Sequence, residues 1–239
     1  MSRELFGFNV DTYSFTEAIN VAKTLIDGNK VSQVITINPE MFKCAESDSE
    51  FANIIKNAEL VIPDGVGVKL ALALNGVNVE RIPGIDFAKN LLMESALNNI
   101  PVAVIGAKED VISKAVENLK NEIQGLNVVY YRNGYFDNDS VIYDELNKTS
   151  PKLVLVAMGS PRQEKFIYNS KKLLKPCLMV GIGGSLDVWS GTLKRAPKFV
   201  QKLGLEWLYR TISQPSRIKR IFPALPIFLI KAFNYRFSK

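Results

Sequence analysis

Histidine is absent from the 239 residues of this sequence. Its absence excludes an imidazole general base, the Ser-His and Cys-His nucleophile pairs, and the commonest zinc ligand. Any acid–base chemistry must therefore use carboxylates, lysine, tyrosine or cysteine.

Cysteines and long apolar runs are also scarce. The two cysteines, Cys44 and Cys177, lie far apart, which excludes a disulfide framework and is typical of a reducing cytosol. We interpret both as core thiols. The N-terminus lacks the pattern of a signal peptide, and no run of about 18 apolar residues predicts a spanning helix. These features predict a cytoplasmic protein.

Two common nucleotide-binding fingerprints are missing. The Walker pattern GxxxxGK[ST] does not occur, which argues against a P-loop NTPase. A GxGG turn occurs at residues 181–184, but no GxGxxG links a strand to a helix with an acidic residue at the right distance. A Rossmann-type oxidoreductase remains an alternative, and binding of NAD without binding of UDP would favour it.

Positive charge is concentrated at the C-terminus. Residues 194–239 contain eleven Lys and Arg against one acidic residue, Glu206, so this segment carries +10 and the rest of the chain −4. Such asymmetry predicts an anionic partner: a lipid surface, a diphosphate or nucleic acid. We expect residues 1–193 to form the catalytic core and residues 194–239 a basic amphipathic appendage. Its last part is too short and too interrupted by proline to span a bilayer, and is expected to lie in the interface.

The rest of the chain alternates between two patterns. Short runs rich in β-branched residues predict buried strands, and segments with helical spacing predict helices between them. This alternation is typical of an α/β fold, here a Rossmann-like, mostly parallel sheet with helices on both faces and a basic helical C-terminal appendage. The expected strands cover residues 5–10, 34–37, 60–62, 102–105, 128–131, 153–156 and 178–180, and the expected helices cover residues 15–27, 45–56, 86–98, 109–124, 161–174 and 196–212.

Ligands of open α/β sheets bind beyond the carboxyl ends of the strands, so polar residues there are the candidates. Thr36 and Asn38 end one strand, with an N-cap role for Asn38 as the alternative. Asp64 follows the next strand, and Gly65 beside it permits close approach of a ligand. A cap is again the alternative for Asp64. Arg81 could bind a phosphate, or pair on the surface with an acidic neighbour, Asp86 or Glu80.

Two further strand ends carry small residues. Met158, Gly159 and Ser160 precede Pro161, and a helix that starts there offers backbone N–H groups to an anion. Gln163 would lie in its first turn. The GxGG turn is weak evidence alone, and it could hold a dinucleotide, a nucleotide sugar or no ligand.

The stretch Asp137-Asn138-Asp139 resembles the DxD that holds a divalent ion in many nucleotide-sugar transferases. It lies in a polar segment, and a turn or N-cap is the better interpretation. No other cluster of carboxylates predicts a metal site.

Taken in order, these segments resemble the WecG/TagA/CpsF family of bacterial glycosyltransferases, and its TagA branch most. The matching stretches extend over most of residues 31–220. They read TINPEMF, AELVIPDGVGV, ERIPGIDF, NGYF, VAMGSPRQEKFI, VGIGGSLDVWSGTLKRAPKFVQKLGLEWLYR and QPSRIKR.

The resemblance implies a UDP-amino sugar donor, UDP-N-acetylmannosamine, and a polyprenyl-diphosphate-linked N-acetylglucosamine acceptor. It implies inversion at the anomeric carbon, no metal and no cofactor, and Asp64 as the base. The implied catalytic residues are Asp64, Thr36, Asn38, Gln163, Arg210, Arg217 and Arg220. The predicted substrate-binding residues are Thr36, Asn38, Asp64, Gly65, Arg81, Gly106, Tyr135, Met158, Gly159, Gln163, Gly183, Gly184, Ser185 and Asp187.

The same resemblance implies that the C-terminal appendage closes over the site at the membrane. We therefore expect attachment to the inner face of the cell membrane, and a deletion from Lys194 onward to abolish transfer while leaving a folded core. Three alternatives stay open: the corresponding uronic acid as donor sugar, a non-enzymatic protein whose basic tail binds nucleic acid, and a homo-oligomer formed through an apolar tail.

Overall fold

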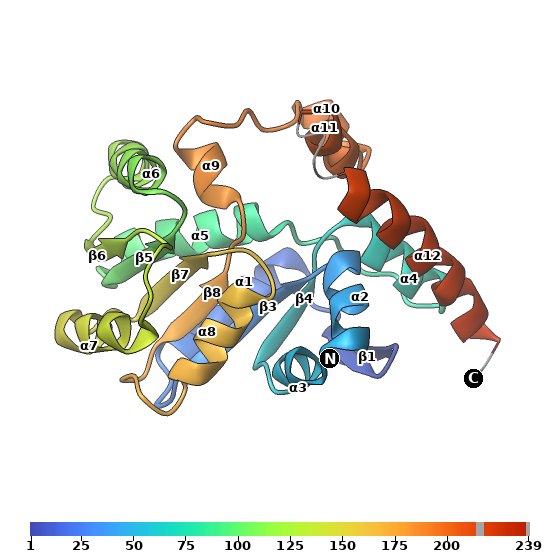
Figure 1. Cartoon of the computed structure of the whole chain (residues 1–239), viewed down its shortest axis with the longest axis horizontal. Helices are drawn as coiled ribbons and strands as arrows, with labels where there is room; N and C mark the ends of the chain where they lie inside the picture. The colour runs from blue at the N-terminus through green and yellow to red at the C-terminus, as the bar shows by residue number, and fades with distance from the viewer. Residues whose placement is uncertain (214–217, 238–239) are drawn as a thin grey trace.

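The computed structural model describes residues 1–213 and 218–237, except the side chains of residues 202, 210, 213 and 218–224. Within these residues, six parallel strands form the main sheet in the order β4-β3-β8-β7-β5-β6 (Figure 1). The strands are β3 (Ser32–Ile37), β4 (Leu60–Pro63), β5 (Val102–Gly106), β6 (Val128–Arg132), β7 (Leu153–Ala157) and β8 (Leu178–Gly181). All six lie where the β-branched runs predict them, and the α/β fold class is confirmed.

Helices cover both faces of the sheet. Alternate strand residues pack against opposite layers, so Val34 and Ile62 belong to one core cluster and Ile35 and Ile37 to another. One layer contains α1 (Phe15–Ile26), α5 (Gly84–Leu97), α6 (Glu109–Glu122) and the short α9 (Ser185–Trp189). The other contains α2 (Pro39–Ser47), α3 (Ser49–Lys56), α4 (Val66–Leu74), α7 (Asp139–Thr149) and α8 (Arg162–Ser170).

Local signals explain several helix boundaries. Ser14 and Glu17 form a capping box that begins α1. The single helix predicted over residues 45–56 is wrong at its start, because the chain forms α2 and α3 with a break at Asp48. The Asp48 carboxylate accepts the Phe51 N–H at 2.9 Å, so it caps α3 rather than continuing α2.

The first strand is also wrong as predicted, because residues 5–10 belong to a hairpin. Its strands are β1 (Ser2–Leu5) and β2 (Phe8–Asp11), and Phe6 and Gly7 turn between them with positive φ. The hairpin lies against β4, where the Asp11 carboxylate accepts the Val61 N–H at 2.9 Å.

In its described residues, the C-terminal segment forms three helices. The helix predicted over residues 196–212 is two short helices, α10 (Lys198–Lys202) and α11 (Glu206–Ser213), separated by Gly204 with φ of +73°. The third, α12 (Ile218–Arg236), continues through Pro226 and packs along α2 and α4 (Figure 1). In the described part of the chain, no helix combines the length and apolar character needed to cross a membrane.

Helix α12 belongs partly to the core. Phe228 is 4% exposed and Ala232 is fully buried, and both join the cluster under α2, α3 and α4. The Phe228 ring lies 5.3 Å from that of Phe6 and 5.1 Å from that of Phe42. A deletion from Lys194 onward would therefore remove residues of this core cluster together with the basic segment.

Candidate active site

A cleft of about 810 Å³ opens beyond the carboxyl ends of β4, β3, β8 and β7. Parallel strands end at one edge of a sheet, so residues far apart in the sequence meet there. The side of the cleft opposite the sheet is formed by Glu206 and Trp207 of α11 and Leu225 of α12. Of the predicted residues, the cleft is lined by Thr36, Asn38, Asp64, Gly65, Arg81, Gly159, Gln163, Gly183, Gly184 and Ser185.

Asp64 lies at the mouth of this cleft, directly after β4. Its backbone N–H donates to the Ile37 carbonyl at 2.9 Å, which places it beside the end of β3. The N-cap of α4 is Gly65, whose φ of +85° favours glycine, and its cap includes no side-chain hydrogen bond. The capping alternative for Asp64 is therefore wrong, since another residue occupies the cap position.

Thr36 and Asn38 occupy the neighbouring strand end. The Asn38 side chain accepts the Met41 N–H at 3.2 Å and caps α2, so the capping interpretation is confirmed, and the residue also lines the cleft. Gly84 lets α5 begin against Thr36, because a Cβ at Gly84 would lie 3.1 Å from the Thr36 hydroxyl oxygen.

Arg81 lies at the edge of the cleft nearest the C-terminal helices. Its guanidinium is 3.9 Å from the Glu206 carboxylate, and both side chains are mostly buried. Asp86, one of the two acidic partners expected for Arg81, instead binds Arg195 through two contacts of 2.6 and 2.7 Å. Glu80 instead accepts the Phe15 N–H.

Arg195 connects the start of the C-terminal segment to the core. Its hydrogen bonds to Asp86, together with the nearby carboxylate of Glu206, raise the pKa of the Arg195 guanidinium further above its usual range. The contact with Glu206 is 3.4 Å. This permanent cation holds two acidic groups together beside the cleft, and so orients the beginning of α11.

Gln163 joins two glycine-containing turns at the base of the cleft. Its side-chain oxygen accepts the Gly183 N–H at 3.0 Å, and its amide nitrogen donates to Glu164 at 2.7 Å. Its own backbone N–H donates to the Gly159 carbonyl at 3.0 Å. Near the same turn, the Ser185 hydroxyl donates to the Ile182 carbonyl at 2.7 Å.

Four predicted residues are not among those that line this cleft. Gly106 has φ of +132°, and any side chain there would collide with the backbone of Ala157 on the adjacent strand β7. Met158 packs beside that turn, Tyr135 is 69% exposed after β6, and Asp187 lies in the first turn of α9. Their roles in substrate binding stay predictions.

The three predicted arginines of the C-terminal segment fall wholly or partly outside the description. Arg217 lies outside the described residues, and the side chains of Arg210 and Arg220 do as well, although their backbones belong to α11 and α12.

Sequence reasoning missed part of the cleft lining. Cys44 lies on α2, where it is half-buried against a core cluster, as expected for a core thiol, and it also lines the cleft. Cys177 is buried, and desolvation raises the pKa of its thiol to about 12. Helical spacing from Glu40 to Cys44 could have identified the α2 face. Trp207 and Leu225 carry no local signal, because only the tertiary packing brings their helices to the cleft.

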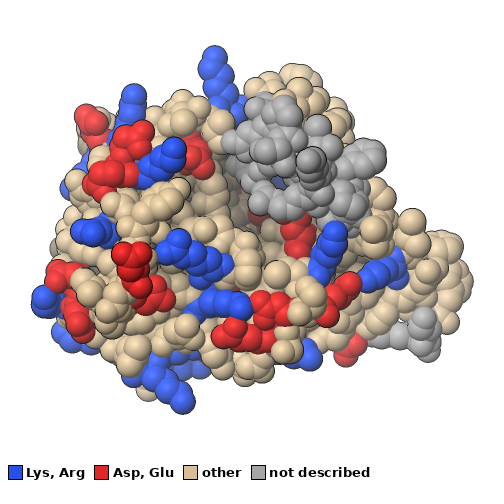
Figure 2. Space-filling view, in the orientation of Figure 1, with Lys and Arg blue, Asp and Glu red and all other residues tan. Residues whose placement is uncertain are grey.

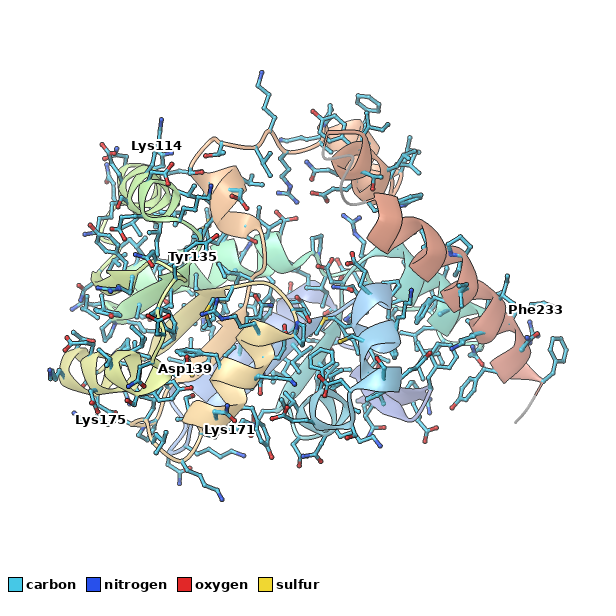
Figure 3. All side chains as sticks on the ribbon, viewed as in Figure 1. Lys114, Tyr135, Asp139, Lys171, Lys175 and Phe233 are labelled. Atoms are coloured by element: carbon cyan, nitrogen blue, oxygen red, sulfur yellow. The ribbon has the colours of Figure 1, made fainter. Side chains whose placement is uncertain are left out.

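The Asp137-Asn138-Asp139 stretch forms the start of α7, as the turn interpretation predicts. Asn138 is the N-cap and accepts the Ser140 N–H at 2.9 Å, and Asp139 begins the helix (Figure 3). Within the residues that the structure describes, no group of three or more Cys, Asp or Glu could hold a metal ion.

Comparison with known proteins identifies the family of this chain. The sequence model of the glycosyl transferase WecG/TagA/CpsF family matches residues 3–239. An N-acetylglucosaminyldiphosphoundecaprenol N-acetyl-beta-D-mannosaminyltransferase from Bacillus subtilis is 34% identical over 200 residues, covering 83% of this chain and 78% of the relative. A protein of the same name from Bacillus spizizenii is 33% identical over 213 residues, covering 89% and 83%. The chain therefore belongs to the WecG/TagA/CpsF family of glycosyl transferases.

Proposed function

We propose that this protein transfers N-acetylmannosamine from UDP to N-acetylglucosamine that is linked through a diphosphate to a polyprenyl lipid. Both relatives carry the name of this activity. The main support for the proposal is Asp64, which lines the same cleft as Thr36, Asn38 and Gln163. In a bacterium, the product would enter the synthesis of wall teichoic acid or a related surface polysaccharide.

The proposed reaction is a single displacement that inverts the anomeric carbon. The acceptor hydroxyl oxygen forms a bond to that carbon while Asp64 takes the hydroxyl proton. The bond between the anomeric carbon and UDP breaks, and UDP leaves with the electron pair. Because no covalent intermediate forms on the protein, the absence of histidine is no obstacle.

The leaving diphosphate needs positive charge around it. Arg81 lines the cleft, and its 3.9 Å contact with Glu206 is longer than a well-formed Arg–carboxylate pair. We assign Arg81 to the diphosphate, since its fork can exchange Glu206 for two phosphate oxygens. Arg210, Arg217 and Arg220 are proposed to join it from the C-terminal helices.

The corresponding uronic acid is the second candidate donor sugar. Its extra carboxylate would need a cation beside the sugar, and Arg81 could supply one. Glu206, which is in contact with Arg81, would repel that carboxylate, so the charge distribution favours the neutral sugar.

A donor screen tests the proposed function. Purified protein with a short-chain lipid-linked N-acetylglucosamine acceptor should form a disaccharide product from UDP-N-acetylmannosamine, with a rate unchanged by a metal chelator. The matched uronic acid donor should react at least about tenfold more slowly, because like charges oppose its binding beside Glu206. Faster transfer of the uronic acid would reverse the donor assignment. No transfer with either sugar, combined with NAD binding, would reject the glycosyltransferase proposal for this chain.

We also propose that residues 194–239 attach the protein to the inner face of the cell membrane. The described part of α12 has a buried face, with Phe228 and Ala232, and an exposed apolar face, with Ile227, Ile230 and Phe233. Phe233 projects away from the body at the outer end of the helix (Figure 3). In the space-filling view, acidic and basic side chains are mixed over the described surface of the body, and the outer end of α12 shows mostly uncharged side chains (Figure 2).

If α12 attaches the protein to a membrane, shortening a side chain on its exposed apolar face should weaken binding to lipid vesicles. Phe233→Ala should weaken binding to vesicles that contain phosphatidylglycerol by about tenfold, because it removes roughly 1.5 kcal/mol of apolar burial. Leu97→Ala is a matched control, since Leu97 is 81% exposed on α5, away from the tail. Equal binding by both variants would contradict this orientation, and preferential binding of DNA or RNA would favour the nucleic-acid alternative.

A further inference from the structure

Two buried side-chain oxygens beneath the cleft have no hydrogen-bond partner among the described residues. They are Glu164 Oε2 and Gln33 Oε1. Glu164 is 2% exposed and Gln33 is fully buried. An ionised carboxylate in such a place is strongly disfavoured, because a buried charge needs a partner. If Glu164 were ionised, both orphan atoms would be acceptors, and neither could satisfy the other.

The other atoms of this buried group are connected to the cleft. Glu164 Oε1 accepts from the Gln163 amide nitrogen at 2.7 Å, and Gln163 Oε1 accepts the Gly183 N–H at 3.0 Å. The amide orientation of Gln163 is therefore determined, with nitrogen toward the acid and oxygen toward the turn. On the other side, the Gln33 amide nitrogen donates to the Glu164 carbonyl at 3.2 Å.

The backbone of β8 leaves space for this pair. A Cβ at Gly181 would lie 2.5 Å from the Gln163 amide nitrogen and 3.2 Å from Glu164 Oε1. Gln163 and Glu164 thus pack directly against the start of the glycine-rich turn at residues 181–184. Because protein interiors are close-packed, a small displacement of either side chain would also displace the turn at the base of the cleft.

Charged and titratable groups face α8 from three neighbouring elements. Asp48 and Glu50 of the α3 end pair with Lys165 on the outer side of α8, at 2.8 and 2.6 Å. Burial raises the pKa of the Cys44 thiol of α2, and the Asp48 carboxylate acts in the same direction while Lys165 opposes it; Glu164 lies within the same electrostatic range. Tyr143 of α7 donates its hydroxyl to the Phe166 carbonyl. The cation Lys165 is already paired with two carboxylates, so it does not favour an ionised Glu164.

We propose that Glu164 is kept as an un-ionised carboxylic acid that positions the Gln163 amide, and through it the turn at residues 181–184, at the base of the cleft. A proton on Oε2 makes that oxygen a donor, and Gln33 Oε1 is the orphan acceptor in the same buried group. Burial raises the pKa of the Glu164 carboxyl, and the hydrogen bond from Gln163 opposes this only in part. Glu164 is thus a positioning residue, and this role rests on the proposed transferase function.

Paired substitutions separate this role from a general structural one. Glu164→Gln should keep kcat/KM within about threefold of the wild-type value, because its amide oxygen still accepts from Gln163 and its N–H₂ replaces the acid proton. Glu164→Ala should lower kcat/KM for the UDP donor by roughly 10²-fold, since the turn loses its support. Glu122→Gln, on the surface of α6, is the matched control. Equal losses in both Glu164 variants would overturn the proposal, because they would show that the negative charge is needed.

Two measurements test the protonation state without any enzymatic activity. Infrared spectra of the wild-type protein near neutral pH should contain a carboxylic acid carbonyl band that disappears in Glu164→Gln. In urea unfolding, wild-type stability should fall relative to Glu164→Gln as pH rises above about 4.5, the usual pKa, because the folded state holds this proton more tightly than the unfolded chain. A missing band, or parallel stability profiles, would overturn the proposal. If no donor reacts with the wild-type protein, the proposed function fails, whereas these two measurements still decide the state of Glu164.

Discussion

Asp64→Asn is expected to lower the turnover of sugar transfer by about 10²–10⁴-fold, which is the usual contribution of a positioned general base. The substitution keeps the volume of the side chain and removes its ability to take the acceptor proton. Steady-state kinetics with saturating donor and acceptor measure the effect. Binding of UDP should change little, because the base acts on the acceptor and the diphosphate is assigned to Arg81.

The stability of this variant separates catalysis from structure. The N-cap of α4 is Gly65, and asparagine keeps the side-chain volume and the ability to form hydrogen bonds, so Asp64→Asn should leave the melting temperature close to that of the wild-type protein. Asp144→Asn, at an exposed position on α7, controls for the loss of one negative charge. Near-normal turnover in a folded Asp64→Asn protein would show that another group accepts the proton.

Phe228→Ala should reduce the free energy of unfolding by about 3–5 kcal/mol, which is the usual range for an aromatic side chain lost from a core. Phe228 is 4% exposed and contacts the rings of Phe6 and Phe42, so the cavity left behind is enclosed by rigid neighbours. Urea unfolding followed by tryptophan fluorescence and by circular dichroism measures this loss.

Phe233→Ala is the matched variant on the opposite face of the same helix. Phe233 is 52% exposed, so its truncation should change stability by no more than about 0.5 kcal/mol. The two variants should therefore differ in what they lose: Phe228→Ala should lose stability, and Phe233→Ala should lose vesicle binding. A Phe228→Ala protein as stable as the wild type would mean that α12 does not pack on the body in solution.

The positions of the six strands of the main sheet could be predicted to within about two residues. Runs such as 102–105 and 153–156 are short, apolar and rich in valine, a pattern typical of a strand buried on both faces. The observed strands β5 and β7 contain these runs and pair in parallel. The candidate positions Thr36 and Asp64 follow from the same reasoning, because polar residues at the ends of parallel strands share one edge.

The errors in prediction have a common origin. Residues 45–56 have continuous helical spacing, and only the Asp48 cap divides them. The prolines and many cations of the tail predict an interfacial segment, and this pattern does not indicate that one face of α12 also packs on the body. Its buried residues, Phe228 and Ala232, repeat at four-residue spacing, but that pattern does not reveal which surface receives them.

By itself, the sequence determined the α/β class, the positions of the six strands in the main sheet and the polar residues that follow them, because these depend on local periodicity and turn chemistry. The tertiary structure alone decided that α12 packs on α2 and α4, that Glu206 meets Arg81, and that Glu164 is buried beneath Gln163. These contacts join residues more than a hundred positions apart or depend on burial from several elements. No local pattern specifies them, because the free energy of packing depends on the complementary surface as well as on the segment itself.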